Sequence, residues 1–333
     1  MNTGELQQQL FAEIKRKIGE TASVADEIAK LLDISTDSAY RRIRGEKTVT
    51  LDELYTLCFH YKISLDQMMN IQTGSFMFQG NLLNPKTFRF DAYLTGIMHT
   101  MAYFNSFKEK EFYFLSKDLH VFYHFYIREI AAFKYYFWMK TLLAFPEFKD
   151  KKIVLDDYPD SLFELGQKSL AIYNQIDSYE VWNFESLNAT IRQIEYYRDN
   201  RMFESDEDVL RVYEALEKLL DHLEKQAELG YKFQYGDPQK KPIAKIQMYL
   251  NEILLLDNSM LLRLDETKLS LVIHTVSNFM MTRDLSFCEN SYQYIKNLLQ
   301  RSTLISEVSE KERTRFFRII RERITKRKEA LKV

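Results

Sequence analysis

The sequence predicts an all-α fold, and three observations lead to that prediction. Hydrophobic residues make up 46% of the 333-residue chain, which is ample material for a core. The chain has 9 glycines and 5 prolines, too few for the frequent tight turns of a β-sandwich or β-barrel. Apolar residues recur every three to four positions over most of the length, the period of an amphipathic helix. No glycine-rich phosphate-binding motif indicates a doubly wound nucleotide fold.

The first seventy residues predict a domain of five short helices. Ser23 and Thr50 are candidate N-caps, and Glu53 completes a capping box with Thr50. Gly45 ends the third helix. The predicted helices are Glu5–Ile18, Val24–Leu32, Thr36–Arg44, Leu51–Tyr61 and Leu65–Met69.

Residues 71–90 predict a linker, because they lack a helical period and contain two glycines, two asparagines and a proline. The expected organisation is therefore a domain over 1–70, a linker over 71–90 and a second domain over 91–333. Aromatic side chains are expected to anchor the linker, at Phe76, Phe78, Phe88 and Phe90.

Long helical segments are predicted throughout the second domain. They are 91–107, 118–144, 160–176, 183–200, 206–229, 241–262, 267–282, 286–301 and 309–330. Residues 111–116 (EFYFLS) are compatible with an isolated strand or with extended chain. Helices of this length with short loops favour stacked antiparallel hairpins, either TPR-like or a bundle, although no consensus repeat is present.

Functional information is concentrated in residues 23–45, which read SVADEIAKLLDISTDSAYRRIRG. This segment resembles the helix-turn-helix of the lambda-repressor/Cro-like (XRE) DNA-binding family. The matching features are Ile28-Ala29, Leu32, the turn Asp33-Ile34-Ser35 and the closing Gly45, followed by Thr50–Leu54 and Ile63–Asp66. The family most often has glycine in the turn, where this chain has Asp33, a residue that tolerates left-handed backbone geometry. The resemblance covers about residues 5–70.

The resemblance implies that the helix starting at Thr36 lies in the major groove of DNA. Ala39 and Ile43 are four residues apart and point inward, so the opposite side of this helix faces outward. Arginine on that side suits guanine and phosphate, and the helix N-terminus suits phosphate. The candidate DNA-binding residues are Ser35, Thr36, Asp37, Ser38, Tyr40, Arg41, Arg42, Arg44 and Lys47.

One other interpretation of this domain stays open. The arginines are also compatible with a solvated face on a non-catalytic adaptor that binds protein and no longer binds DNA. No nucleophile motif or cofactor motif is present, so neither an enzyme nor a cofactor is predicted. His99, His120 and His124 lack an HExxH pattern and an evident third ligand, so no metal site is predicted.

Aromatic residues crowd residues 103–138, more than one helix face needs. They predict either a bulky core or a ligand groove in which tyrosine hydroxyls supply polar contacts. The candidate groove residues are Tyr123, Tyr126, Tyr135, Trp138 and Tyr196.

The last predicted helix is strongly basic and carries a narrow apolar stripe, Phe316, Phe317, Ile320 and Ile324. One interpretation is a helix docked by this stripe with its basic residues solvated or in ion pairs. The other is an additional contact with DNA phosphates or with an acidic surface.

These observations together predict a transcriptional regulator that binds double-stranded DNA. Its plan resembles the Rgg/PlcR-type regulators in architecture only, with a helical domain for dimerisation and for sensing a small molecule or peptide. A homodimer would present two reading helices about 34 Å apart to a palindromic site. Two cysteines without a paired motif, and the absence of a signal peptide or membrane span, predict a cytoplasmic protein.

Overall fold

The structure is a computed structural model, and it describes residues 3–18, 23–69, 76–80, 84, 86–253, 259–275 and 278–331. The chain divides into two compact units, Met1–Met77 (unit 1) and Phe78–Val333 (unit 2), which are treated separately below. The linker predicted over 71–90 falls partly outside the described residues, at 71–75, 81–83 and 85. Its later part belongs to unit 2, where Phe88 packs against the core and Phe90 begins a helix.

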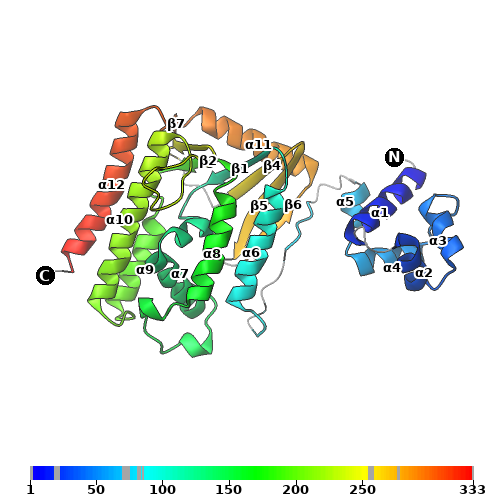
Figure 1. The fold of residues 1–333 in the computed structure, drawn as a ribbon, viewed down its shortest axis with the longest axis horizontal. Coiled ribbons are helices and arrows are strands. Elements are labelled where there is room, and N and C mark those ends of the chain that lie inside the picture. The colour runs from blue at the N-terminus through cyan, green and yellow to red at the C-terminus, as the bar shows by residue number, and fades with distance from the viewer. Residues whose placement is uncertain are drawn as a thin grey trace. The chain divides into compact units, whose positions relative to one another are not determined.

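Unit 1 contains the five predicted helices (Figure 1). They are α1 (Thr3–Ile18), α2 (Val24–Leu32), α3 (Thr36–Ile43), α4 (Leu51–Tyr61) and α5 (Leu65–Met69). The predicted bounds are confirmed to within two residues, with Arg44 as the C-cap of α3. The helices enclose a small core of fully buried side chains, Leu10, Phe11, Ile14, Ala25, Ile28, Ala29, Ala39 and Leu57.

The turn between α2 and α3 has the left-handed geometry expected at Asp33. Its φ and ψ are 52° and 50°, and its backbone N–H donates to the Ala29 carbonyl. The Ser35 side chain then caps α3 by accepting from the Ser38 N–H at 3.3 Å. The predicted capping box of α4 is also present, with Thr50 and Glu53 bonding each other's backbone. Local capping thus fixes the angle between α2 and α3.

Unit 2 contains a seven-stranded mixed sheet, so the prediction of an all-α protein is wrong. The strand order is β6-β5-β4-β1-β2-β3-β7. The adjacent strands β1, β2 and β3 are parallel, and all other neighbouring pairs are antiparallel. The strands are β1 (Lys110–Leu115), β2 (Asp177–Trp182), β3 (Ile246–Leu250), β4 (Ser259–Leu264), β5 (Thr267–Thr275), β6 (Asn278–Thr282) and β7 (Thr303–Leu304).

The helices predicted over 241–262 and 267–282 are the largest errors, because strands β3 to β6 occupy these segments. Strands β3 (IQMYL) and β5 (TKLSLVIHT) alternate apolar with mostly polar residues, which is the period of a strand, whereas β4 (SMLLRL) and β6 (NFMMT) contain short apolar runs that a buried helix could also have. The scarcity of glycine did not exclude a sheet, because other residues make the turns. Asp265, with φ of 50°, forms the β4–β5 turn, and its carboxylate accepts from the Glu109 N–H at 2.8 Å.

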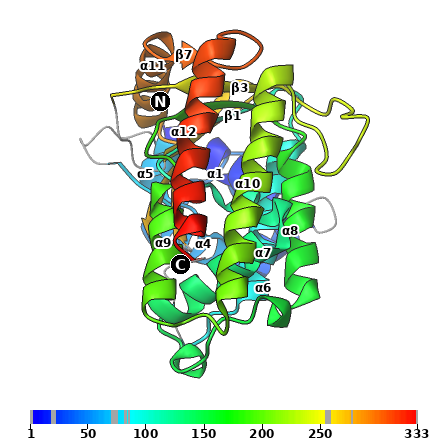
Figure 2. The same cartoon turned by 90° about the vertical axis from the view of Figure 1, so that its left-hand side faces the viewer.

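Helices cover both faces of the sheet (Figures 1 and 2). One face carries α11 (Leu285–Gln300), which packs on β4, β5 and β7. The other face carries the main helical layer of α6 (Phe90–Asn105), α7 (Arg128–Phe137), α8 (Asp160–Tyr173), α9 (Asn188–Asp199), α10 (Asp206–Leu229) and α12 (Glu310–Glu329). The arrangement is therefore helix, sheet and helix, and not the predicted stack of helical hairpins.

The helix predicted over 118–144 is broken into three pieces in this layer. They are the 3₁₀ helix η1 (Val121–Tyr126), α7, and the π-helical turn η2 (Trp138–Leu142). Short 3₁₀ turns also occur at η3 (Pro146–Phe148) and η4 (Leu155–Asp157). Strand β1 coincides with the segment that was compatible with an isolated strand, but it lies at the centre of the sheet.

The basic helix α12 is docked along α10 (Figure 2), as one of its two interpretations expected. The apolar stripe Phe316, Phe317, Ile320 and Ile324 is buried. Ion pairs hold its basic residues to other helices, including Arg321 to Asp221 and Lys328 to Glu217, each at 2.7 Å. The positive charge of this helix is therefore largely matched within unit 2.

A buried carboxylate, Glu180 on β2, lies between the sheet and the main helical layer. It is 0% exposed. Its oxygens accept hydrogen bonds from the Tyr123 hydroxyl at 2.7 and 2.8 Å and from the Tyr173 hydroxyl at 2.6 Å. Ser178 Oγ and Trp182 Nε1 donate at 3.1 and 3.0 Å. Such a set of donors can stabilise a charge without contact with water.

The same donors and nearby cations control the ionisation of Glu180. Burial by itself raises the pKa of this carboxyl, but His120, Lys232 and Tyr173 outweigh burial and lower it to about 2. The Lys232 side chain is also buried, and burial lowers its pKa to about 7 despite the attraction of Glu180. Lys232 Nζ donates to the Ile176 carbonyl at 2.7 Å. The folded state therefore favours the ionised form of Glu180.

Replacing this carboxylate, as Glu180→Gln, is expected to lower the free energy of unfolding of unit 2 by about 3 kcal/mol at pH 7. Because the pKa of Glu180 is lower in the folded than in the unfolded state, its stabilisation is present above pH 4.5 and is lost as pH falls toward 2. The difference in the free energy of unfolding between wild type and Glu180→Gln should therefore narrow by about 1 kcal/mol between pH 6 and pH 4.

Denaturant unfolding followed by tryptophan fluorescence measures this gap, because Trp138 and Trp182 both lie in unit 2. Tyr179→Phe, on the opposite face of β2, is the control and should keep a constant difference from wild type at every pH. A gap for Glu180→Gln that widens in acid would contradict the assigned direction of the pKa.

Candidate nucleic-acid interface and ligand cavity

Helix α3 presents most of the predicted DNA-binding residues to solvent. Thr36, Asp37, Tyr40, Arg41 and Arg44 are exposed, and so are the N-cap Ser35 and Lys47 in the following loop. Ala39 on the opposite side is completely buried, and Ser38 is half-buried. Thr36 Oγ1 donates to Asp26 Oδ1 at 3.3 Å and links the start of α3 to α2. The exposed residues form one surface, which we call the α3 face: Ser35, Thr36, Asp37, Tyr40, Arg41, Arg44 and Lys47.

Arg42 does not belong to the α3 face, contrary to its sequence-based assignment. Its side chain is buried, with Nε 3.0 Å from Glu53 Oε2 and Nη2 2.5 Å from Glu53 Oε1. Nη1 donates to the Ser38 carbonyl at 3.1 Å. The hydrogen bond from Arg42 is the main reason that the pKa of Glu53 is lowered. Arg42 therefore joins α3 to α4 in a bidentate ion pair.

Gln7 on α1 is a second buried polar contact that the sequence did not indicate. Its Nε2 donates to the carbonyls of Arg42 and Lys47 at 2.7 and 2.8 Å, and its Oε1 accepts from the Val49 N–H at 3.1 Å. One amide thus holds the end of α3 and the loop that follows it. In the sequence, the only sign of this contact is a polar residue, Gln7, among the apolar positions of α1.

The two exposed arginines of the α3 face share an acidic neighbour. Glu46 Oε2 lies 3.9 Å from Arg41 Nε, and Glu46 Oε1 lies 3.3 Å from Arg44 Nε. All three side chains are about half exposed, so these ion pairs are weak and can open when a stronger anion approaches.

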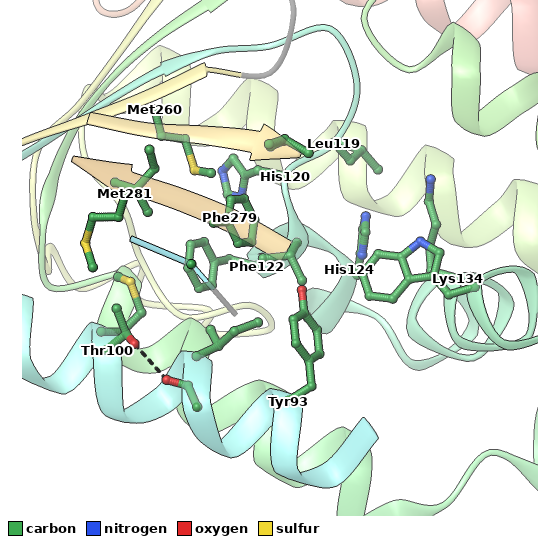
Figure 3. Close-up of a pocket in the computed structure, with 18 of the residues that line it drawn as sticks. Tyr93, Thr100, Leu119, His120, Phe122, His124, Lys134, Met260, Phe279 and Met281 are labelled. Carbon is green, nitrogen blue, oxygen red and sulfur yellow. Dashed lines mark hydrogen bonds between the residues drawn. The ribbon is translucent and has the colours of Figure 1, made fainter. Parts of the chain in front are cut away.

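Unit 2 contains a cavity of about 1030 Å³ between α6 and the strands β4, β5 and β6. The lining is mostly apolar and includes Phe88, Ile97, Met101, Phe112, Phe122, Trp138, Met260, Leu271, Phe279 and Met281. Figure 3 shows His124 and Lys134 at one end and Met260 and Met281 at the other, with the Tyr93 hydroxyl directed into the space between. A volume of this size is in the range of small-molecule sites.

Polar atoms gather where η1, α6 and α7 meet the cavity. Within the described part of the chain, the Tyr93 hydroxyl, His124 Nε2 and both ring nitrogens of His120 are buried without a hydrogen-bond partner. Burial, together with the nearby charge of Lys134, lowers the pKa of His124 well below its usual value. Burial likewise lowers the pKa of His120. Both imidazoles are therefore neutral near pH 7.

The predicted aromatic groove is not formed as expected. Tyr123 and Tyr126 are buried in the core, where they bond Glu180 and Asn174, and neither lines the cavity. Tyr135 is half-buried and also lies away from it, whereas Tyr196 is exposed on α9. Of the five candidates only Trp138 lines the cavity. The crowded rings thus form mostly core, and the cavity lining comes largely from α6 and the unpredicted strands.

Metal binding and membrane insertion find no support in the described residues. Among these residues no group of three or more His, Cys, Asp or Glu side chains is placed to hold a metal ion. No helix in the same set of residues has the length and apolar character needed to cross a membrane. Comparisons with protein families, with curated proteins and with solved structures found no match to this chain.

Removing the buried arginine, as Arg42→Ala, is expected to destabilise unit 1 because the half-buried Glu53 loses its partner. The expected cost is about 2–3 kcal/mol, measured as faster hydrogen exchange of the α3 and α4 amides in the full chain under native conditions. Arg41→Ala is the matched control, since its side chain is exposed, and should change exchange by less than about 0.5 kcal/mol. Equal effects of the two variants would show that Arg42 does not hold α3.

Proposed function

We propose that this protein is a sequence-specific transcriptional regulator that binds double-stranded DNA through unit 1. The observation that carries the proposal is the α3 face. It combines an exposed helix surface bearing Arg41 and Arg44 with a short capped turn to α2. The resemblance of residues 23–45 to the lambda-repressor/Cro-like helix-turn-helix supports the same conclusion.

The chemistry of the α3 face suits base and phosphate recognition. Arg41 and Arg44 carry planar guanidinium groups that can bond guanine bidentately or neutralise phosphates. Tyr40 and Lys47 lie beside them and can contact the sugar-phosphate backbone. Because Arg42 and Gln7 hold α3 from the buried side, the exposed side chains project from a helix of fixed orientation, which favours a specific sequence.

The proposal includes the remaining expectations for the regulator. It would act in the cytoplasm and bind a palindromic site as a homodimer. The competing function is an adaptor that uses the same fold to bind protein. It predicts little salt-dependent affinity for DNA and no dependence of that affinity on Arg41.

The deciding experiment is fluorescence anisotropy with a duplex from the upstream region of the protein's own coding sequence, against a scrambled duplex, at several salt concentrations. Wild type should prefer the upstream duplex and lose affinity as salt rises. Arg41→Ala/Arg44→Ala should bind at least about 100-fold more weakly, with a salt slope smaller by about 2 if both contact phosphates.

The control is Lys15→Ala/Arg16→Ala, which removes the same charge from exposed positions on α1. It should bind within about threefold of wild type. Equally weak binding by wild type and by both double variants would reject DNA binding and favour the adaptor.

The ion pairs of Glu46 give a second, opposite prediction. Glu46→Gln removes the carboxylate that competes with phosphate for Arg41 and Arg44, so DNA binding should become about two- to fivefold tighter at low salt. The gain should shrink as salt screens the lost repulsion. The same anisotropy titration measures it. Weaker binding by Glu46→Gln would mean that the carboxylate itself contacts a base or orients an arginine.

A further inference from the structure

We propose that the cavity of unit 2 binds an uncharged, largely apolar small molecule that carries one hydroxyl-type group. The site and its ligand class stand on the cavity alone. That this ligand would regulate DNA binding rests on the DNA-binding function proposed above.

The apolar lining sets the main property of the ligand. Side chains from α6, η1, η2 and the four strands β1, β4, β5 and β6 contribute aromatic, methionine and aliphatic surface to the cavity, and no single element forms it. Water in such a space has few polar atoms to bond, so an apolar molecule gains by displacing it. The methionines Met101, Met260 and Met281 can adjust to the shape of the occupant.

The unpartnered polar atoms set where the hydroxyl lies. Tyr93 and His124 both contact the Trp138 ring, with ring centroids 6.3 and 5.6 Å from it. The His124 ring also bonds the Leu119 backbone, which assigns its proton to the nitrogen facing that carbonyl. Nε2 is then an acceptor with no donor among the described residues. A ligand hydroxyl would donate to His124 Nε2 and accept from the Tyr93 hydroxyl.

The charges around this end of the cavity favour an uncharged ligand. The buried ammonium of Lys134 already bonds Asp118 at 3.2 Å, Thr190 at 2.6 Å and Gln193 at 2.9 Å. Three acceptors saturate its three N–H groups, so it has no donor left for an anion. An anionic ligand would therefore enter a mostly apolar space without a free counter-charge.

The start of unit 2 connects this cavity to the chain that leads from unit 1. Gln79, two residues after unit 1 ends, lines the cavity and pairs with Met281 at the sheet edge. Both N–H···O distances of this bridge are 2.7 Å, and Met281 lines the cavity as well. A ligand that packs against Met281 would therefore stabilise this pairing next to unit 1 in sequence.

The test uses the full chain and Nile red, an uncharged apolar dye whose fluorescence rises in an apolar site. Three competitors of similar length displace it: 1-decanol, decyl methyl ether and decanoate, at pH 8. We expect 1-decanol to bind at least 10-fold more tightly than decanoate and at least threefold more tightly than the ether, which cannot donate to His124. Decanoate binding as well as 1-decanol would overturn the uncharged ligand, and equal binding of the ether would overturn the hydroxyl contact.

Two variants place the binding in the cavity. Gly96 on α6 lines the cavity at an exposed position, and a Cβ added there meets no atom within 4 Å, so the indole of Gly96→Trp has room to lie over the cavity and should abolish Nile red binding without disturbing the fold. His99→Trp, exposed on the same helix and outside the lining, is the matched control and should bind like wild type. Tyr93→Phe should weaken 1-decanol about fivefold at unchanged stability, because its hydroxyl has no partner among the described residues. Equal Nile red binding by Gly96→Trp and wild type would overturn the site.

Hydrogen exchange at the Gln79 and Met281 amides tests the link without DNA. Saturating 1-decanol should slow both by at least fivefold in wild type and leave Gly96→Trp unchanged. Unchanged exchange of both amides with intact Nile red binding would overturn the coupling between the cavity and the Gln79–Met281 bridge, and it would leave the ligand site standing. Because no step uses DNA, failure of the α3 face to bind DNA would leave the ligand result standing.

Discussion

The architecture of unit 2 depends on the ionised, fully buried carboxylate of Glu180. Its hydrogen-bond donors come from β2 itself, from η1 through Tyr123 and from α8 through Tyr173, so one side chain fixes how two helical segments sit on the sheet. A buried charge is tolerated only when its surroundings satisfy it, which makes this cluster sensitive to misplacement of any donor. The crowded aromatic segment thereby acquires a definite packing: its tyrosines are placed by hydroxyl contacts as well as by shape.

Unit 1 also depends on buried polar contacts, in a smaller core. Its apolar core is small, and the ion pair of Arg42 with Glu53 and the amide of Gln7 supply the directional contacts that the core lacks. These contacts lie on the buried side of α3, so Arg41 and Arg44 on the exposed side are not needed to hold the helix in place. In the proposed regulator, neighbouring residues divide two roles, with Arg42 stabilising unit 1 from the buried side and Arg41 and Arg44 available to DNA on the exposed side.

Sequence reasoning succeeded for the capped helices and failed for the sheet of unit 2. Caps and stops, such as Thr50 with Glu53, are encoded within a few residues, and the helices of unit 1 and α10 were predicted almost to the residue. Strand β1 pairs with β2 and β4, which lie far along the chain, as in Glu111↔Asp177 and Glu111↔Arg263, so its central place has no local signal. Strands β3 (IQMYL) and β5 (TKLSLVIHT) do alternate with the period of a strand, and the helix prediction overlooked that signal. The exposed part of the α3 face was predicted, but Arg42 was misassigned because a salt bridge to α4 is not visible in the sequence. The cavity was missed for the same reason as the strands that line it.

The central position of β1 has a consequence for how the chain reaches its fold. Its antiparallel neighbour is β4, and the ion pair of Glu111 with Arg263 spans 152 residues. During synthesis at about 5–20 residues per second, β1 waits roughly 10–30 s before β4 leaves the ribosome. Until then one edge of β1 has no strand beside it, and the backbone N–H and C=O groups along that edge are unpaired. Unit 1 folds from local contacts well within that interval, so the nascent chain carries a finished first domain beside an incomplete sheet that is open to chaperones and to aggregation.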